Sequence, residues 1–390
     1  MTGIDKQFDY AVPDGFGPLR LGDRVRIDLN GRRVGGWVVG LSSTPTDGVD
    51  KNSLRPLAGR SGAGVEPELI DLCRWIGDAW CGPFRAVLAS ASSPSMRLAA
   101  ANARKGRAPV PGDDPVSLAA TELRAKGGGC LRVPPLASAL SVVSAVADRG
   151  PVLVICPTRR MVSLGAASLR RKGLGVAVVP DEWAVASVGA NVVIGTRSAV
   201  FAPCPGLSTI VVIDEHDEAL KEERSPAWDA TSVALERGRR EGVPVLTTSP
   251  APSAAEHERT GGPGLAVDVA PEWPRIVVED LSEEKVSGTL LGSHLLEAAR
   301  DASGVTLAIL NTKGRARLLG CRACNALQRC STCRSLLSES DGVLTCERCV
   351  ESRGTVCIEC GRTSFRILRT GTAGLCAQLE RSTGVGAVEV

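Results

Sequence analysis

The run Ile210-Val-Val-Ile213 lies near the middle of the chain, and four similar apolar runs flank it. All are short and rich in β-branched side chains, and the other four cover residues 152–155, 176–179, 192–194 and 243–246. Helical patterns alternate with them, for example at residues 161–172 and 229–240. Short apolar strands separated by helices are typical of a parallel sheet that is buried on both faces. We therefore expect an α/β domain between about residues 118 and 250.

The region before this domain has a different pattern. Residues 7–60 are predicted to be β-rich, because Arg24-Val-Arg-Ile27 alternates in polarity and Trp37-Val-Val-Gly-Leu41 is apolar. Asn30-Gly31 lies between the two runs and is a turn signal. A helix is predicted from about Glu66, because apolar residues follow it at helical spacing.

Composition bounds the class of protein. The 390 residues are 43 % hydrophobic and 23 % charged, with a net charge of +3, which excludes a disordered chain and a strongly basic coat protein. No run of 18 apolar residues predicts a membrane span, and the N-terminus lacks the apolar core of a signal peptide. We therefore expect a cytoplasmic protein of two or three domains, with residues 101–115 as a linker.

Fourteen cysteines are unexpected in such a chain, because thiols stay reduced in the cytosol. Six are scattered in apolar or small-residue surroundings and are interpreted as ordinary core or surface residues. The other eight lie within forty residues as four Cys-x-x-Cys pairs: Cys321/Cys324, Cys330/Cys333, Cys346/Cys349 and Cys357/Cys360.

Two Cys-x-x-Cys knuckles complete one tetrahedral four-cysteine site, so four knuckles predict two structural Zn²⁺ sites. Spacing leaves three pairings open: side by side, interleaved or nested. A strand predicted at residues 306–310 leads into this region. Residues 303–338 contain no acidic side chain and several basic ones. This favours a nucleic-acid contact, with a solvated basic face as the alternative.

Several motifs resemble the PriA replication-restart helicase family. Three of them follow one another, as Val193-Ile-Gly-Thr-Arg-Ser-Ala-Val-Phe-Ala-Pro203, Ile210-Val-Val-Ile-Asp-Glu-His-Asp217 and Lys221-Glu-Glu-Arg-Ser-Pro226. Thr247-Thr-Ser-Pro-Ala-Pro-Ser253 is similar to the family's Ser-Ala-Thr-Pro-Ser motif. Leu310-Asn-Thr-Lys-Gly-Arg-Ala316, followed by the knuckles, is similar to the segment that leads into the family's cysteine-rich insertion.

The resemblance implies a multidomain α/β fold. Residues 1–107 would form a β-rich domain that binds DNA 3′ ends, and residues 108–270 a degenerate RecA-like helicase lobe 1. Residues 271–390 would begin lobe 2 and carry the zinc-binding insertion at 319–365. The resemblance also supplies the pairing of the cysteines. Cys321, Cys324, Cys357 and Cys360 would hold one Zn²⁺, and Cys330, Cys333, Cys346 and Cys349 the other.

The departures from the family concern ATP. A phosphate-binding loop needs Gly-Lys-[Ser/Thr], and none of the eight lysines follows a glycine. The position expected for this loop holds Gly127-Gly-Gly-Cys-Leu-Arg-Val-Pro-Pro135. The metal-holding Asp falls at Ile213, which leaves Asp214, Glu215 and His216 as a degenerate nucleotide site or a solvated strand end. Val390 lies near the point where the family's second lobe continues, so the arginines of that lobe would be missing. We therefore expect no ATP hydrolysis and doubtful nucleotide binding.

The N-terminal motifs Phe8-Asp-Tyr-Ala-Val-Pro13 and Gly22-Asp-Arg-Val-Arg26 are similar to the family's 3′-end-binding domain. The resemblance implicates Phe8, Asp9 and Tyr10, with Arg55 as a basic pocket residue and a glycine near Gly31. An aspartate can accept a hydrogen bond from a 3′-hydroxyl, aromatic rings stack on bases, and an arginine contacts phosphate. The alternative is that both aromatic residues are strand core and Asp9 faces water.

The predicted function is that of a replication-restart primosome protein. It would bind stalled or branched fork DNA, help uncover a loading site for the replicative helicase, and contact other primosome proteins without ATP-driven unwinding. Its location would be the cytoplasm, at the nucleoid, with no membrane contact. The alternatives are an active ATP-dependent 3′–5′ helicase, a zinc-ribbon interaction module that binds no DNA, and a remnant of a decayed gene.

Overall fold

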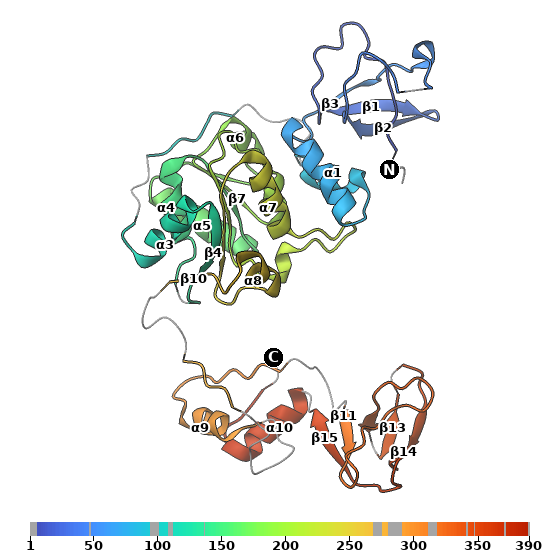
Figure 1. Ribbon diagram of the computed structural model, residues 1–390, viewed down its shortest axis with the longest axis vertical. Coiled ribbons are helices and arrows are strands. Elements are labelled where there is room, and N and C mark those ends of the chain that lie inside the picture. The colour runs from blue at the N-terminus through green and yellow to red at the C-terminus, as the bar shows by residue number, and fades with distance from the viewer. Residues whose placement is uncertain are drawn as a thin grey trace. The chain divides into compact units, whose positions relative to one another are not determined.

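The computed structural model describes residues 6–46, 48–93, 101–107, 112–135, 137–267, 275–279, 291–310, 318–340, 342–346, 348–369 and 372–388. The chain divides into two compact units, Met1–Pro274 and Arg275–Val390, and each is described by itself (Figure 1). None of the helices in the described part of the chain is long and apolar enough to cross a membrane.

The N-terminal sheet is antiparallel, with strand order β2-β1-β3. Its strands are β1 (Arg24–Leu29), β2 (Arg32–Trp37) and β3 (Gly59–Gly62). Asn30 and Gly31 join β1 to β2 with φ of 49° and 73°, as a two-residue hairpin turn requires. Leu29 pairs with Arg32 across this turn, and the pairing continues as far as Arg24 with Trp37. Strand β2 therefore ends at Trp37. The strand predicted at residues 37–41 was therefore placed too late.

The parallel sheet has seven strands in the order β10-β4-β9-β8-β5-β7-β6. They are β4 (Gly128–Arg132), β5 (Val152–Ile155), β6 (Val176–Val178), β7 (Val192–Gly195), β8 (Thr209–Val212), β9 (Val245–Ser249) and β10 (Leu265–Ala266). All five β-branched runs are confirmed as strands, within about two residues at most boundaries. The α/β prediction for this region is correct.

Helices cover both faces of this sheet (Figure 1). One apolar cluster joins Val152 and Val154 of β5 to α3 (Pro115–Ala125), α4 (Ser141–Val146) and α5 (Arg159–Arg171). The other joins Leu153 and Ile155 to α6 (Trp183–Val188) and α7 (Ala230–Glu241). Successive side chains of one strand point to opposite faces, so a continuous apolar run supplies both clusters.

Two further helices precede the lobe in sequence but belong to its core. They are α1 (Ile70–Ala79) and α2 (Phe84–Ala91), and α1 follows a 3₁₀ turn at Pro67–Leu69. The helix predicted from Glu66 is thus confirmed. Leu72 and Ile76 of α1 are fully buried in the same cluster as Leu153 and Ile155. The N-terminal region is therefore packed against the parallel sheet as one unit.

Part of the predicted linker is fixed in place. The Arg104 amide donates to the Gly189 carbonyl at 2.8 Å, and the Arg107 amide donates to the Gly173 carbonyl at 2.9 Å. A Cβ atom at Gly175 would lie 1.8 Å from the Arg104 carbonyl oxygen, so only glycine permits this approach. Residues 101–107 are thus docked on the lobe, while residues 108–111 of the predicted linker lie outside the described residues.

The second unit is built from small sheets and two helices, α9 (Ser293–Asp301) and α10 (Thr372–Thr383). Strands β11 (Leu318–Cys321) and β15 (Phe365–Arg369) pair, and β12 (Ser338–Ser340), β13 (Val343–Thr345) and β14 (Ser352–Gly354) form a three-stranded sheet. The strand predicted at residues 306–310 is wrong, because no described residue pairs with it and Leu307 is 76 % exposed. Residues 311–316 of the quoted motif lie outside the described residues.

Candidate nucleic-acid and metal sites

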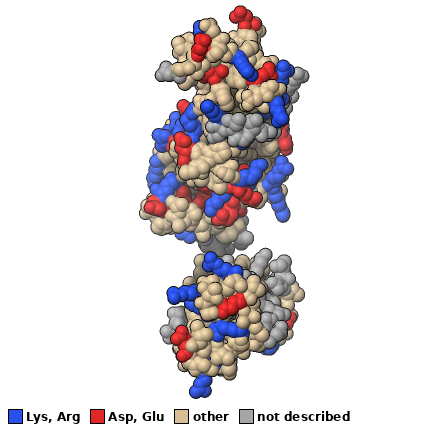
Figure 2. Space-filling view, turned by 90° about the vertical axis from the view of Figure 1, so that its right-hand side faces the viewer, with Lys and Arg blue, Asp and Glu red and all other residues tan. Residues whose placement is uncertain are grey.

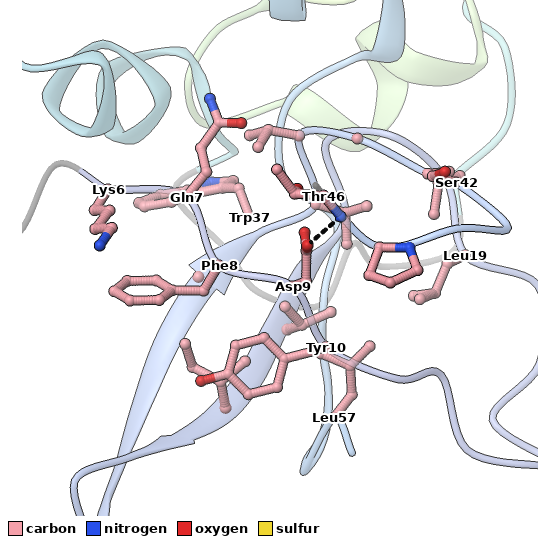
Figure 3. A pocket seen from close by; sticks show the side chains of 18 of the residues that line it. Lys6, Gln7, Phe8, Asp9, Tyr10, Leu19, Trp37, Ser42, Thr46 and Leu57 are labelled. Atoms are coloured by element: carbon pink, nitrogen blue, oxygen red, sulfur yellow. Dashed lines mark hydrogen bonds between the residues drawn. The ribbon is translucent and has the colours of Figure 1, made fainter. Parts of the chain in front are cut away.

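An open pocket of about 1130 Å³ lies beside the N-terminal sheet (Figure 3). The segment that contains Phe8, Asp9 and Tyr10 lines it together with β2, the following loop and the start of α2. Its charged lining residues are Lys6, Lys51, Arg74, Arg85, Asp9 and Asp78. Four cations face two carboxylates, so the pocket carries a net positive charge that suits a phosphate chain.

Asp9 is an exposed acceptor in this pocket. One carboxylate oxygen accepts a hydrogen bond of 2.8 Å from the Thr46 amide, drawn as a dashed line in Figure 3. This bond lowers the pKa of Asp9 below its ordinary value. The side chain is therefore ionised at neutral pH and fixed in orientation. Its second oxygen can accept from a hydroxyl in the pocket.

The two aromatic residues differ in exposure. The Phe8 ring is 43 % exposed, and the Lys6 Nζ lies 5.8 Å from its centroid. The Tyr10 hydroxyl donates to the Asp28 carbonyl at 3.3 Å, and burial raises the pKa of Tyr10. Tyr10 is thus held by the sheet, while Phe8 presents a ring face on which a base can stack.

Two predicted site residues lie elsewhere. Gly31 is in the β1–β2 turn, and Arg55 is exposed on a neighbouring loop; neither lines the pocket. Glycines do line it at Gly35 and Gly36 on β2, where an added Cβ would meet no atom within 4 Å. Of the five residues that the resemblance implicated, Phe8, Asp9 and Tyr10 line this pocket, and their role in DNA binding stays a prediction.

The stretch expected to hold the phosphate loop, residues 127–135, is divided between a strand and the loop that follows it. Gly128 and Gly129 begin β4, so the loop at the carboxyl end of this strand is residues 133–140 and not the glycine run. Pro134 and Pro135 have no amide hydrogen. Within the described part of this loop, the Ala137 amide already donates to the Pro134 carbonyl at 3.0 Å. Neither the two prolines nor the Ala137 amide therefore offers a donor to a phosphate.

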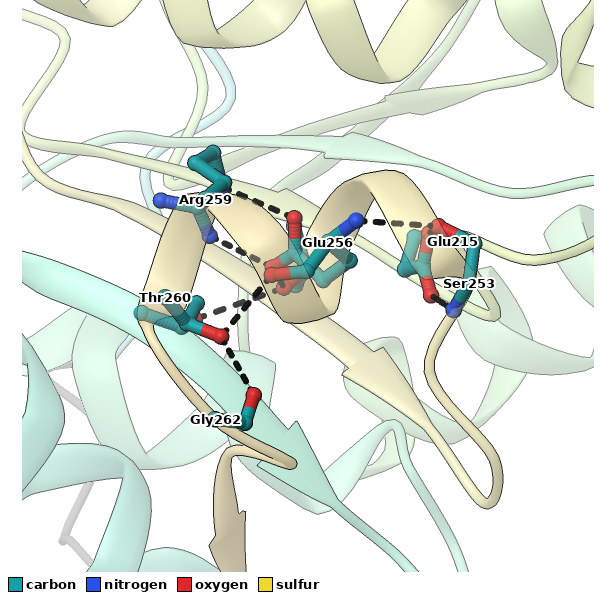
Figure 4. Close-up of polar contacts among 8 residues, drawn as sticks. Glu215, Ser253, Glu256, Arg259, Thr260 and Gly262 are labelled. Atoms are coloured by element: carbon teal, nitrogen blue, oxygen red, sulfur yellow. Dashed lines mark hydrogen bonds and ion pairs between the residues drawn. The ribbon is translucent and has the colours of Figure 1, made fainter.

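The acidic side chains after β8 are also engaged (Figure 4). Glu215 is buried, and its two oxygens accept from the Ser253 amide at 2.7 Å and the Ser253 hydroxyl at 2.8 Å, at the start of α8 (Ala254–Thr260). Burial raises the pKa of Asp214, which has a φ of 50°. His216 Nδ1 lies 2.7 Å from the Ser249 hydroxyl. The structure brings these three residues together at one strand end, with Glu215 used to anchor α8.

A neighbouring glutamate completes this anchor. Glu256 is 3 % exposed, and one of its oxygens accepts from the Thr247 hydroxyl at 2.5 Å. The same carboxylate forms an ion pair with Arg259, one turn further along α8 (Figure 4). Both carboxylates near the β9 end therefore hold helix to sheet. Sequence reasoning did not single out Glu256, because an acid in the first turn of a helix is common.

The eight clustered cysteines form two groups of four. Cys321, Cys324, Cys357 and Cys360 make one group, and Cys330, Cys333, Cys346 and Cys349 make the other; within each group all Sγ atoms lie within 4.8 Å of one another. This is the nested arrangement that the family resemblance implied. All eight are free thiols.

The sulfur spacings fit a tetrahedral metal site. Adjacent Sγ atoms are 3.5 Å (Cys321–Cys360) and 3.7 Å (Cys324–Cys357) apart in the outer group. In the inner group Cys330–Cys349 is 3.3 Å and Cys333–Cys346 is 3.4 Å. Four sulfurs at ~2.3 Å from a central Zn²⁺ would be about 3.8 Å apart. The groups can hold metal ions of the thiophilic kind.

Two residues around the clusters were not found from the sequence. Gln328 is fully buried; its amide group donates to the Cys357 sulfur at 3.5 Å and accepts from Arg353 at 3.1 Å. Glu351 lies 2.9 Å from the Cys330 sulfur and also accepts from the Thr332 hydroxyl. Such contacts orient metal ligands. Only the folded chain reveals them, because neither residue belongs to a Cys-x-x-Cys pair.

A β-rich domain with a basic pocket, a parallel-sheet lobe and a double four-cysteine region define a multidomain α/β protein. Comparison with known proteins agrees with this class. Residues 1–93 match the family model described as the 3′DNA-binding domain (3′BD) of PriA. A probable replication restart protein PriA of Mycobacterium leprae is 28 % identical over 98 % of this chain and 64 % of its own length. The replication restart protein PriA of Synechocystis is 28 % identical over 49 % of this chain and 26 % of its own length.

Most of the chain is therefore similar to replication restart proteins of the PriA kind, at 27–28 % identity over 95–98 % of its length. It spans less than two thirds of the length of the curated relatives that it matches. Among solved structures, the DUF1998 helicase MrfA bound to DNA and AMPPNP is 16 % identical over 44 % of this chain and 31 % of that chain, with a TM-score of 0.29. A score this low carries no argument about function.

Proposed function

We propose that this chain is a replication-restart protein that binds stalled or branched fork DNA and uncovers a site for loading the replicative helicase. The observation that carries the proposal is the basic pocket around Asp9, which lies within the residues that match a 3′DNA-binding domain. A terminal 3′-hydroxyl would donate to the Asp9 carboxylate, the last base would stack on Phe8, and the lining cations would contact phosphates. Arg55, on the neighbouring loop, would contact the strand outside the pocket.

Two Zn²⁺ ions belong to the proposal. Each four-cysteine group would hold one ion, which supplies folding free energy and no catalysis, because four protein ligands leave no open position. The module at residues 319–365 would add strand contacts and a platform for primosome proteins. The three functional parts would be residues 1–107, 108–270 and 271–390. The protein would act in the cytoplasm, at the nucleoid.

The proposed role does not include ATP-driven unwinding. The loop after β4 offers no lysine, and two of its residues are prolines. The Glu215 carboxylate, which would activate water in a motor, accepts two hydrogen bonds from Ser253. DNA-stimulated ATP hydrolysis above that of a heat-inactivated sample would overturn this part and favour an active 3′–5′ helicase.

The direct test measures binding to a fork whose leading-strand 3′ end carries either a hydroxyl or a phosphate. Fluorescence anisotropy should show tighter binding of the hydroxyl form, and Asp9→Asn should abolish that difference. Asp14→Asn, which changes an exposed aspartate outside the pocket, is the matched control. Equal affinity of the unchanged protein for forks and linear duplexes would refute fork recognition.

A second candidate function is a zinc-ribbon interaction module that binds no DNA. The exposed apolar side chains of Val350 and Ile358, at 80 % and 57 %, favour a protein contact at this module. Deletion of residues 319–365 separates the two ideas. Fork binding that survives the deletion supports the pocket. If neither the full chain nor the deletion variant binds fork DNA, only the interaction module remains.

A further inference from the structure

A second basic surface lies on the lobe, away from the Asp9 pocket. Its cations come from two segments that are far apart in the sequence, the docked segment 101–107 and the C-terminal end of α5. They are Arg104, Lys105, Arg107, Arg170, Arg171 and Lys172. We call these six residues the α5-end patch.

The fold fixes the two segments against each other. The Arg107 amide donates to the Gly173 carbonyl at 2.9 Å, and the Gly106 amide donates to the Asn191 side chain at 2.6 Å. A Cβ atom at Gly106 would lie 2.0 Å from the Gly173 carbonyl oxygen. The cations of residues 101–107 are therefore held beside those of α5 on a rigid backbone.

Few carboxylates neutralise this surface. Glu182 lies between Arg104 and Arg170, at 2.7 Å and 2.8 Å, and is shared by both. Asp181 precedes Glu182 in the sequence. The two segments that carry the cations, residues 101–107 and 159–172, contain no acidic residue. Lys105, Arg107 and Arg171 are exposed and form no ion pair among the described residues. The patch thus keeps a clear positive excess at neutral pH.

Stabilisation of α5 accounts for only part of this arrangement. Cations at a helix C-terminus complement its dipole, which explains Arg170 and Arg171. The helix dipole does not explain why residues 101–107 bring Lys105 and Arg107 to the C-terminal end of α5. Like charges gathered without partners repel one another, so their gathering costs stability and indicates an anionic ligand.

The patch is separate from the loops where a RecA-like lobe holds nucleotide. Helix α5 begins after β5 at the carboxyl edge of the sheet and ends before β6, at the amino edge. Ligands of open parallel sheets bind at the carboxyl edge. The α5-end patch therefore lies at the opposite edge from Asp214 and Glu215.

We propose that the α5-end patch binds the phosphate backbone of duplex DNA. Four of its six cations are arginines, whose planar guanidinium groups match phosphate oxygens. The proposal rests on the DNA-binding role proposed above, but it needs neither the Asp9 pocket nor a free 3′ end. A restart protein would thereby hold a double-stranded arm of the fork while the pocket holds the strand end.

The test uses a dumbbell duplex with closed ends, which offers no 3′ terminus. The triple variant Lys105→Gln, Arg107→Gln, Arg171→Gln should bind it about tenfold or more weakly, and the slope of log K against log[salt] should fall by about 2–3, near 0.9 per phosphate contact. The triple variant should keep the preference for a fork with a 3′-hydroxyl end that Asp9→Asn abolishes. This separates failure of the patch from failure of the 3′-end pocket.

The matched control removes three exposed cations that have carboxylate partners, as Lys126→Gln, Arg149→Gln, Arg239→Gln. An equal loss in this control would overturn the proposal, because net charge alone would then explain binding. Unchanged dumbbell affinity in the patch variant would also overturn it. Preferential binding of poly-glutamate over duplex DNA at the patch would overturn it as well, because the partner would then be an acidic protein. Unchanged thermal melting shows that the variants are folded.

Discussion

The parallel-sheet lobe and the four-cysteine region are stabilised in different ways. The lobe buries two large clusters of aliphatic and aromatic side chains, one on each face of the sheet. The four-cysteine region buries a small cluster in which two of the five residues are cysteines: Leu319, Cys330, Leu337, Leu344 and Cys346. A core this small cannot offset the conformational entropy of about forty residues.

This difference teaches that one chain can draw on two sources of folding free energy. Apolar burial contributes about 25 cal/mol per Å² and is spread over many side chains, so it degrades gradually. Metal binding concentrates its contribution in four sulfur atoms, so the loss of one ligand is decisive. Charge does not distinguish the regions as sharply: Figure 2 shows acidic and basic side chains interspersed on the visible face of both units.

Metal removal is expected to have the largest effect. Cys346→Ser, or a strong chelator, should unfold residues 319–365 while the lobe keeps its own melting transition, because each site contributes about 10–16 kcal/mol. Zinc analysis should give two ions for the unchanged chain, and limited proteolysis should show cleavage confined to the second unit of the variant. Cys81→Ser, an exposed cysteine outside both groups, is the control. Two firmly held ions in Cys346→Ser would contradict the comparison.

A cavity in the lobe is expected to have the next largest effect. Phe201 is fully buried, with its ring 5.1 Å from that of Trp228. Phe201→Ala should lower the free energy of unfolding by about 3–5 kcal/mol, measured by denaturant titration of tryptophan fluorescence. Zinc content should not change. Phe8→Ala, at a half-exposed ring, should cost far less; a similar cost would mean that the lobe core is not the dominant source of stability.

Loss of the buried amide beside the outer cysteines should have a smaller, local effect. Gln328→Leu removes the donor to the Cys357 sulfur and the acceptor of Arg353 Nη2. The outer site should lose zinc about 10–100-fold more readily, while the inner site releases it at its original rate. Chelator competition resolves the two phases. Glu339→Gln, outside the knuckles, is the control, and equal release from both sites would show that Gln328 acts only on the fold.

The smallest expected effect is at a helix cap. Asp229 accepts from the Ser232 amide at 2.7 Å and the Ser232 hydroxyl at 2.8 Å, and so caps α7. Asp229→Ala should cost about 1 kcal/mol in thermal or denaturant unfolding, and Asp229→Asn should recover most of it. A loss of more than about 2 kcal/mol would indicate that the cap also supports the packing of α7 on the sheet.

Local patterns predicted the regular parts of this molecule well. The runs at 152–155 and 210–213 became central strands, because an apolar β-branched run has no stable alternative to burial. The run at 306–310 is also mostly apolar but has no strand partner among the described residues, and it is not a strand. Pairing is a property of two segments, and a single segment does not report it.

The candidate sites divide in the same way. The motif placed Phe8, Asp9 and Tyr10 side by side in the chain, and the fold places them in one pocket, with Gly31 in the β1–β2 turn outside it. The stretch 127–135 was predicted to hold the position of the phosphate loop, and residues 128–132 of it form β4. Only the strand boundary shows that residues 133–140 occupy the carboxyl edge.

The sequence alone determined three properties: a parallel α/β lobe, two four-cysteine groups and the lack of a phosphate-binding lysine. Each depends on residue types at short, fixed spacings, where chain geometry leaves little freedom. Tertiary structure decided that Glu215 anchors α8, that Gln328 contacts the outer cysteines, and that residues 101–107 join α5 in a basic surface. These contacts join residues that are far apart in the chain. Their partners are set by how the elements pack, which no local pattern encodes.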